Sequence, residues 1–265
     1  MIGLLTLLGL LTGVLINLLA DSLPTVRRIE RPACAQCGRP RRLWAWSGLL
    51  AYLSGTSRCT NCGQRLSIRH PLVEVGTALV FALLGLQEVP TLTRVANLIY
   101  AAVFILVLVT DLEHRLILHG VMLPAIALAL GAAFVDPQFK HPAFGLLGGA
   151  IGLGAALSLY WLGILFTKIM SRARGRPINE VAFGFGDVTL ITFIGLIVGV
   201  PGIIFALIIG ILCGGVGSML YLIVSGLIRR KYSAFTAIPY GPFLILGGVL
   251  LRYFGTALMT WYFAP

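Results

Sequence analysis

Long uninterrupted runs of apolar residues limit what this chain can fold into more than any other feature. One run extends over residues 1–20 and another over residues 202–227. A bilayer-spanning helix needs about 20 mostly apolar residues, whereas membrane barrels use short segments of alternating hydrophobicity. Only 11% of the 265 residues are charged, against roughly 25% in an ordinary soluble domain. These features predict a helical membrane protein and exclude a soluble enzyme, a disordered tail and a secreted disulfide scaffold.

The chain has room for about eight transmembrane helices. The first is expected at residues 1–20, which carry no preceding basic residue and are interpreted as a retained span instead of a signal peptide. The predicted fold class is an all-α polytopic membrane protein with a cytoplasmic, zinc-ribbon-like loop between its first two spans. The other spans are expected at residues 72–86, 95–111, 116–135, 143–170, 185–200, 202–227 and 241–262.

The net charge of +11 comes mostly from clusters of basic residues between the apolar runs. One cluster lies between Asp21 and His70, and smaller clusters follow at residues 168–176 and 229–231. Loops rich in lysine and arginine stay on the cytoplasmic side of a membrane. The clusters therefore predict a plasma-membrane protein with both termini outside. We expect these basic loops to contact the lipid bilayer, and we expect no nucleic acid as a partner.

Four of the five cysteines form two CxxC pairs in the first basic loop. Each pair can bring two thiolates to one ion, and two pairs about 20 residues apart are typical of a four-cysteine zinc ribbon. Such a closed coordination sphere predicts a structural ion. The alternatives are two disulfides or free thiols, although a reducing cytoplasm disfavours disulfides. The expected ligands are Cys34, Cys37, Cys59 and Cys62, and Cys213 is interpreted as a packing residue.

The nine acidic residues are candidates for function, because acids near a bilayer are costly. Asp111 ends one apolar run and Asp187 begins another, and the predicted topology places both at the cytoplasmic face. Gly184 and Gly186 would permit close approach of a substrate backbone to Asp187. By contrast, Glu88 and Asp136 fall in the outside loops and are expected to be solvated.

Two aspartates brought together can share a proton. One then acts as a general base for water, and the other acts as a neutral acid toward a carbonyl oxygen. The spacing alone leaves other readings open. The pair could be two interfacial anchors facing water, or it could serve a proton-coupled transporter.

Several motifs, in order along nearly the whole chain, resemble the type IV prepilin peptidases. The stretch Gly184-Phe185-Gly186-Asp187 matches the GxGD motif of intramembrane aspartyl proteases, and the residues from Asp111 resemble the first aspartate motif of the family. The CxxC pairs match its bifunctional branch. Further likenesses lie at Asn17, at Leu23-Pro24, from His70 to Glu74, and from Ile238 to Phe243.

The resemblance implies an enzyme with two activities. It would cut the leader from prepilins and pseudopilins after a glycine at the cytoplasmic membrane face, and then methylate the new N-terminal amine with S-adenosylmethionine. Asp111 and Asp187 would be the catalytic pair, supported by Gly184 and Gly186. The four cysteines would bind zinc. The loop of residues 21–74, including Glu74, is implicated in methyl transfer. Residues 1–88 would form the N-terminal part with the loop, and residues 89–265 the peptidase domain.

The sequence also departs from the family's pattern. Leu118 follows Ile117 where the family has proline, Thr189 stands where it has lysine, and Ser22 where it has arginine. No Asn-Ile-Pro motif lies between the cysteine pairs. The alternative functions are a peptidase without methyl transfer, a proton-coupled transporter, and a scaffold whose loop docks a partner protein.

Overall fold

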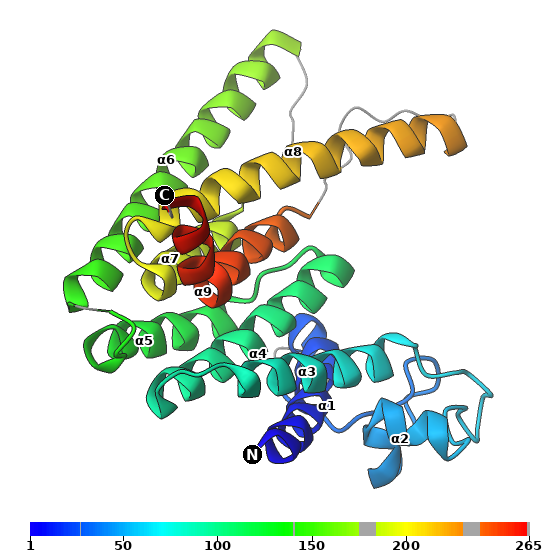
Figure 1. The fold of residues 1–265 in the computed structure, drawn as a ribbon. Helices are drawn as coiled ribbons and strands as arrows, with labels where there is room; N and C mark the ends of the chain where they lie inside the picture. Colours follow the sequence, from blue (N-terminus) through cyan, green and yellow to red (C-terminus); the bar gives the residue numbers. More distant parts are fainter. Residues whose placement is uncertain (27, 140, 175–183, 230–238, 264–265) are drawn as a thin grey trace. The chain divides into compact units, whose positions relative to one another are not determined.

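A computed structural model describes residues 1–26, 28–139, 141–174, 184–229 and 239–263. Within these residues the fold is helical, with two isolated β-bridges in place of a sheet. Figure 1 shows the long helices and, between α1 and α3, a loop with two short helices, η1 (Leu43–Trp46) and α2 (Gly48–Leu53). The long helices are α1 (Ile2–Val26), α3 (Arg69–Leu86), α4 (Thr91–His114), α5 (His119–Val135), α6 (Pro142–Arg174), α7 (Phe185–Val198), α8 (Gly202–Arg229) and α9 (Gly241–Phe263).

The predicted fold class is confirmed. Each expected span coincides with one long helix, with bounds that differ by a few residues. In the described residues, α1, α3, α4, α6 and α8 are long and apolar enough to cross a membrane, whereas α5, α7 and α9 are shorter apolar helices. The protein is therefore a multi-pass membrane protein. Some basic residues used to predict its orientation lie outside the described residues: Arg27, Lys140, Arg176, Arg230 and Lys231.

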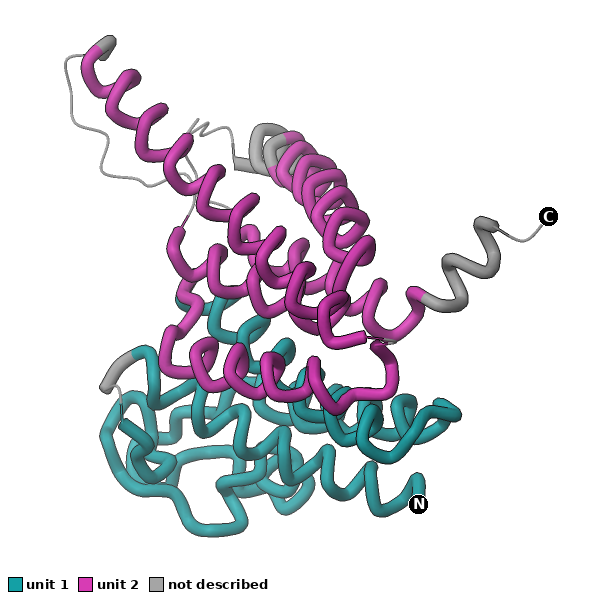
Figure 2. The backbone as a smooth tube through the Cα atoms, turned by 90° about the vertical axis from the view of Figure 1, so that its left-hand side faces the viewer, with its two compact units in different colours: residues 1–114 teal, residues 115–265 magenta. Residues whose placement is uncertain are grey.

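The chain divides into two compact units, which Figure 2 shows in different colours. Unit 1 comprises residues 1–114, with α1 to α4 and the cysteine loop. Unit 2 comprises residues 115–265, with α5 to α9. The sequence analysis expects a functional division between residues 88 and 89, which lies before α4. The compact units divide after residue 114, because α4 packs with α1 and α3 in unit 1.

In unit 1, small residues let α1 and α3 approach closely. A Cβ atom on Gly9 would lie 2.7 Å from the Cα of Ala78, and one on Gly13 would lie 2.6 Å from the Cα of Glu74. These two glycines are four residues apart and therefore share one helix face. Lipid tails provide no hydrophobic drive for helices to associate, so such backbone contact contributes much of the packing. This contact holds α1 beside the start of α3, where the cysteine loop returns to the membrane.

In unit 2, α7 is the central helix and packs against α5, α6, α8 and α9. Its side chains from Val188 to Ile197 are almost all buried. Gly148 of α6 faces Gly195 of α7, and a Cβ atom on either glycine would lie 2.3 Å from the other's carbonyl oxygen. The helix that begins with the GxGD motif is therefore held along its length by close backbone packing.

Asp136 corrects one sequence expectation. The sequence analysis expects a solvated side chain, but the residue is buried, with 4% of its surface exposed. Its Oδ2 lies 2.7 Å from the guanidinium of Arg252 on α9, and that guanidinium also donates to the carbonyl of Ile197 at 2.8 Å. Ile197 is in the last turn of α7, where carbonyls lack helical partners and favour a cation. The pair therefore joins the end of α5, the end of α7 and the middle of α9.

Replacing Arg252 with methionine should destabilise unit 2, because Asp136 would stay buried without its guanidinium. Removing one partner of a buried ion pair costs about 3–5 kcal/mol. The free energy of unfolding, measured by titrating detergent micelles with sodium dodecyl sulfate, should fall by this amount in Arg252→Met.

The matched control is Lys168→Met, an exposed position on α6, where a change within about 0.5 kcal/mol is expected. The double variant Asp136→Asn with Arg252→Met should recover part of the loss, because it removes the uncompensated charge. An Arg252→Met protein as stable as the control would show that the pair contributes nothing to the fold.

Candidate functional site

The four cysteine sulfurs of the loop converge on one point. All four lie within 4.8 Å of one another. The Sγ atoms of Cys34 and Cys62 are 3.5 Å apart, and those of Cys37 and Cys59 are 3.7 Å apart. A tetrahedral zinc ion with Zn–S bonds of about 2.3 Å requires sulfurs about 3.8 Å apart. The cluster therefore has the donor set and the spacing for a tetrahedral metal ion.

Two similar turns place these sulfurs. The N–H groups of Gly38 and Gly63 each donate to the carbonyl of the first cysteine of their pair, Cys34 or Cys59, at 2.9 Å. Both glycines have positive φ angles, 69° and 74°, which favour glycine over other residues. Isolated bridges close each turn, Ala33 with Pro40 and Arg58 with Arg65.

Backbone donors also favour the thiolate form at the first cysteine of each pair. N–H groups of Cys62 and Asn61 lower the pKa of the Cys59 thiol to about 6. The N–H groups of Cys37 and Gln36 lower the pKa of Cys34 in the same way. Metals bind thiolates and not thiols, so both turns prepare a ligand before an ion arrives.

The carboxylate of Glu74 fastens the loop to the membrane helices. Glu74 is on α3, is 1% exposed, and accepts four hydrogen bonds. Three come from the start of α2: the hydroxyl of Ser47 at 2.6 Å and the N–H groups of Gly48 at 2.6 Å and Leu49 at 3.0 Å. The fourth comes from the amide of Asn17 on α1 at 3.3 Å. The structure thus places Glu74 where it holds α1, α2 and α3 together, and direct contact with a methyl donor stays a prediction.

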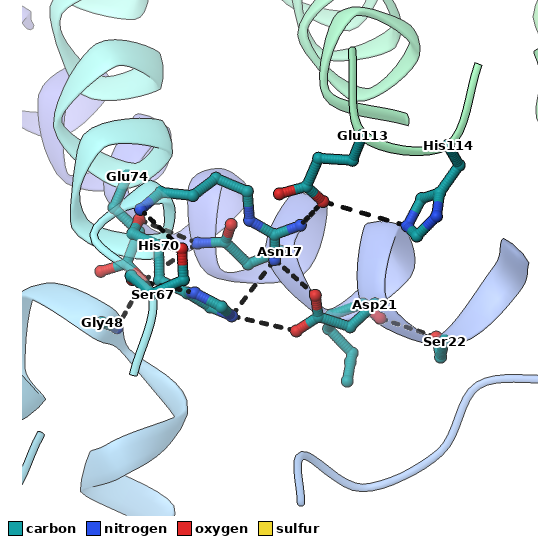
Figure 3. A network of polar contacts seen from close by, with 11 residues as sticks. Asn17, Asp21, Ser22, Gly48, Ser67, His70, Glu74, Glu113 and His114 are labelled. Atoms are coloured by element: carbon teal, nitrogen blue, oxygen red, sulfur yellow. Dashed lines mark hydrogen bonds and ion pairs between the residues drawn. The ribbon is translucent and has the colours of Figure 1, made fainter. Parts of the chain in front are cut away.

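A second polar network lies at the adjacent ends of α1, α3 and α4 (Figure 3). The guanidinium of Arg69 donates to Asp21 on α1 and to Glu113 on α4. The ring of His70 lies between Asp21 and the carbonyl of Ser67, with its nitrogens 3.0 Å and 3.2 Å from them. Sequence reasoning missed this network. The signal for it was an acid near the end of α1 and another at the end of α4, with a basic residue at the start of α3.

A cavity of about 570 Å³ opens beside this network, with all of its lining in unit 1. Its size falls in the usual range for small-molecule sites, about 300–1,000 Å³. The helix ends contribute Asn17, Asp21, Arg69, His70, Glu113 and His114 to its walls. The cysteine loop contributes, among others, Glu30, Arg31, Cys34, Arg41, Trp46 and Arg65.

Asp111 lies in the last turn of α4 and is 5% exposed. Glu113 and His114, which line the cavity, follow it two and three residues later in the same helix. His114 is three residues from Asp111, so the two share a face of α4. The first predicted catalytic residue therefore lies within one helical turn of the cavity wall.

Asp187 is the third residue of α7. Its Oδ2 accepts a hydrogen bond from the N–H of Gly184 at 3.0 Å, and an acid in the first turn is favoured by the helix dipole. The space beside Gly186 is filled by Ile117, since a Cβ atom there would lie 2.7 Å from that of Ile117. Gly186 therefore allows α7 to pack against the chain before α5.

Aromatic side chains surround the start of α7. The ring of His119 stacks on Phe185 with centroids 5.5 Å apart, and Tyr160 meets the same ring edge-on at 5.9 Å. Burial raises the pKa of Tyr240, and the negative charge of Asp187 raises it further. The structure thus brings Tyr240, from the motif before α9, into the electrostatic field of Asp187. Ile238 of that motif lies outside the described residues.

The two aspartates belong to different units, Asp111 to unit 1 and Asp187 to unit 2. Their meeting in space stays a prediction from the sequence.

Comparison with protein families gives two matches in the order that the sequence predicts. A model described as the bacterial peptidase A24 N-terminal domain matches residues 7–87. A model described as the type IV leader peptidase family matches residues 98–219. The chain belongs to the type IV leader peptidase family. The first model covers the cysteine loop, and the second, which describes a protease family, covers the helices that carry Asp111 and Asp187.

Individual relatives agree with this family. A prepilin leader peptidase/N-methyltransferase of Pseudomonas putida is 27% identical, over 93% of this chain and 88% of the relative. One from Bacillus subtilis is 24% identical, over 99% of this chain and 98% of the relative. A type 4 prepilin-like proteins leader peptide-processing enzyme of Escherichia coli is 28% identical, over 85% and 76% respectively. No solved structure matches the chain.

Zinc analysis tests the cysteine cluster. The purified protein should contain about one zinc ion per chain, because four converging thiolates fill a tetrahedral shell. Cys34→Ser should lose the ion and make the loop sensitive to proteases. Cys213→Ser, which alters a cysteine in α8, should keep it. Wild-type protein without zinc in inductively coupled plasma mass spectrometry would contradict the assignment.

Glu74→Ala should release the loop from the bundle, because four donors would lose their acceptor. Unsatisfied buried donors cost about 1–3 kcal/mol each. Limited proteolysis should then cut between residues 27 and 68 much faster than in the wild type. Glu74→Gln should have a smaller effect, since one oxygen remains. Glu88→Ala, at an exposed position, is the control, and equal cutting rates in all variants would exclude an anchoring role.

Proposed function

We propose that the chain is an aspartyl endopeptidase of the bacterial plasma membrane that processes type IV prepilins and pseudopilins. It removes their leader peptide after a glycine at the cytoplasmic face, and it methylates the new N-terminal residue with S-adenosylmethionine. The observation that carries this proposal is the family match over both parts of the chain, with an aspartate at each motif position. The relatives named above support both prepilin processing and methylation.

Asp111 and Asp187 form the catalytic pair in this proposal, with residues 89–265 as the peptidase domain. A shared proton keeps one carboxyl neutral while the other is ionised. The ionised carboxylate takes a proton from water as the water attacks the scissile carbonyl, and the neutral acid donates a hydrogen bond to the carbonyl oxygen. When the C–N bond breaks, the departing amine takes up a proton from the pair. No covalent intermediate forms.

Each aspartate lies near the end of a helix. Asp111 is 5% exposed near the end of α4. Asp187 is in the first turn of α7, where its Oδ2 accepts a hydrogen bond from the N–H of Gly184 at 3.0 Å. Both would be reached by a substrate whose apolar helix lies in the lipid and whose basic leader stays at the cytoplasmic surface. The predicted orientation, with the basic loops inside the cell, would put both aspartates at the cytoplasmic side of the membrane.

Residues 1–88 contribute a zinc-stapled loop and the methyl-transfer activity. Zinc held by the four cysteines has no open coordination position, and its contribution is to fold a loop whose small buried core, in the described residues, consists of Ala45, Ala51 and Leu66. Methyl transfer requires the amine that the peptidase step releases, so it follows cleavage.

Asp111→Asn and Asp187→Asn test the peptidase assignment. Each variant should lose leader cleavage by about 10²–10⁴-fold or more, because an amide can neither accept nor supply the proton. Mass spectrometry of a prepilin incubated with the detergent-solubilised enzyme measures the loss. Glu88→Gln is the matched control, an exposed acid expected to leave cleavage unchanged. Near wild-type cleavage by either aspartate variant would exclude the pair as the catalytic centre.

A further inference from the structure

The two short helices of the cysteine loop carry large apolar side chains on their outer surface. Four of these side chains are more than half exposed: Leu43 and Trp44 on η1, and Leu50 and Leu53 on α2. Leu50 and Leu53 are three residues apart, so they share one face of α2. Exposed apolar residues gathered in one segment mark a surface that contacts a membrane or another protein.

We propose that η1 and α2, residues 43–53, form an interfacial anchor that inserts these four side chains into the bilayer. The anchor lies at the boundary between the lipid headgroups and the acyl chains, and it holds the cysteine loop against the membrane surface. The inference concerns unit 1 alone and does not depend on the proposed enzymatic activity.

The inner sides of the two short helices are already occupied by the loop itself. Ala45 of η1 and Ala51 of α2 are buried with Leu66 in the small core of the loop. The hydroxyl of Tyr52 donates to the carbonyl of Leu66 at 2.5 Å. The four exposed side chains of the anchor are therefore those that the core of the loop leaves outside.

Contacts with α3 determine how deep the anchor lies. The N–H groups of Gly48 and Leu49 donate to the carboxylate of Glu74, and a Cβ atom on Gly48 would lie 2.4 Å from that of His70. The start of α2 is therefore beside the first two turns of α3 (Figure 1). With 18 residues, α3 is about 27 Å long, against about 30 Å for the hydrocarbon core of a bilayer. A helix this short spans the bilayer only when both of its ends lie at the membrane surfaces.

The level of Glu74 on α3 matches that of an interfacial helix. Glu74 follows Arg69, the first residue of α3, by five positions, which is about 7.5 Å along the helix axis. Interfacial helices bury their apolar faces about 5–10 Å into the boundary of headgroups and acyl chains. At the same level of α3, Leu72 and Val75 are exposed, as lipid-facing residues are. The start of α2 therefore lies in the boundary layer and not free in solution.

The charge of the loop complements an anionic membrane surface. Residues 31–73 contain seven arginines and no acidic residue. Arg39 and Arg42 precede the anchor, Arg58 follows it, and all three are exposed. Guanidinium groups pair with lipid phosphates, while their aliphatic stems lie along apolar surface. Tryptophan is also enriched at membrane interfaces, and Trp44 supplies one here. The segment thus matches the headgroup region of an anionic bilayer in both polarity and charge.

Quenching of Trp44 fluorescence by brominated lipids measures the depth of the anchor. The full-length, zinc-loaded protein keeps Trp44 and carries Trp46→Phe, Trp161→Phe and Trp261→Phe. It is placed in nanodiscs of phosphatidylcholine and phosphatidylglycerol. Bromines near the headgroup end of the acyl chains should quench Trp44 more strongly than bromines near the chain ends. Equal quenching at all depths, or none, would overturn the proposal.

Removing apolar side chains from α2 should release the anchor. Leu50→Ser combined with Leu53→Ser should lower the quenching of Trp44 by about twofold or more, because the membrane affinity of an interfacial helix scales with its apolar area. The matched control is Leu86→Ser combined with Leu92→Ser. These leucines are also exposed, and they lie at the ends of α3 and α4 away from the cysteine loop. Zinc content shows that the loop of each variant is folded. Equal quenching in both double variants would exclude insertion of α2.

Photochemical cross-linking in the native membrane identifies what covers the anchor. p-Benzoyl-phenylalanine takes the place of Leu53, which is 77% exposed. Irradiation should give a protein whose mass has increased by that of one phospholipid. A cross-link to a second copy of this chain or to another protein, without a lipid adduct, would overturn the proposal. None of these measurements involves a prepilin, so their failure would leave the proposed function to its own tests.

Discussion

The absence of water inside a bilayer is the constraint on which the rest of this structure depends. Backbone polar groups must then find partners within their own segment, which leaves helices as the main element. The same constraint makes each buried charge costly unless it is paired. The few charged side chains near the helices therefore serve as connections. Glu74 joins three helices of unit 1, and the Asp136–Arg252 pair joins three helices of unit 2.

The cysteine loop depends on two such connections because it cannot build a sufficient core of its own. The converging thiolates close the loop on itself, and Glu74 attaches it to α3. Neither contact replaces the other, since one sets the internal shape of the loop and the other sets its position on the helices. Together they place the loop wall opposite Arg69 and its two acids, and this arrangement creates the cavity.

The glycines of the chain have different roles that only packing distinguishes. Gly9, Gly13, Gly148 and Gly195 allow helices to touch backbone to backbone. Gly38 and Gly63 turn the chain around the sulfurs with positive φ angles. Gly186, in the GxGD motif, admits Ile117 and so fixes the start of the helix that carries Asp187. The motif glycine beside Asp187 thus positions that helix.

The sequence by itself determined the helical membrane fold, the approximate helix bounds and the family. It also showed that four cysteines form two CxxC motifs in one loop. Hydrophobic run length and CxxC spacing are local properties, so a sequence alone reveals them. It also singled out both aspartates by their motifs. Only the tertiary structure decided that Asp136 is buried with Arg252, that Glu74 anchors the loop, and that Arg69 joins Asp21 to Glu113. Each of these contacts joins residues at least 25 positions apart, and no local pattern records which distant partner a charged side chain meets.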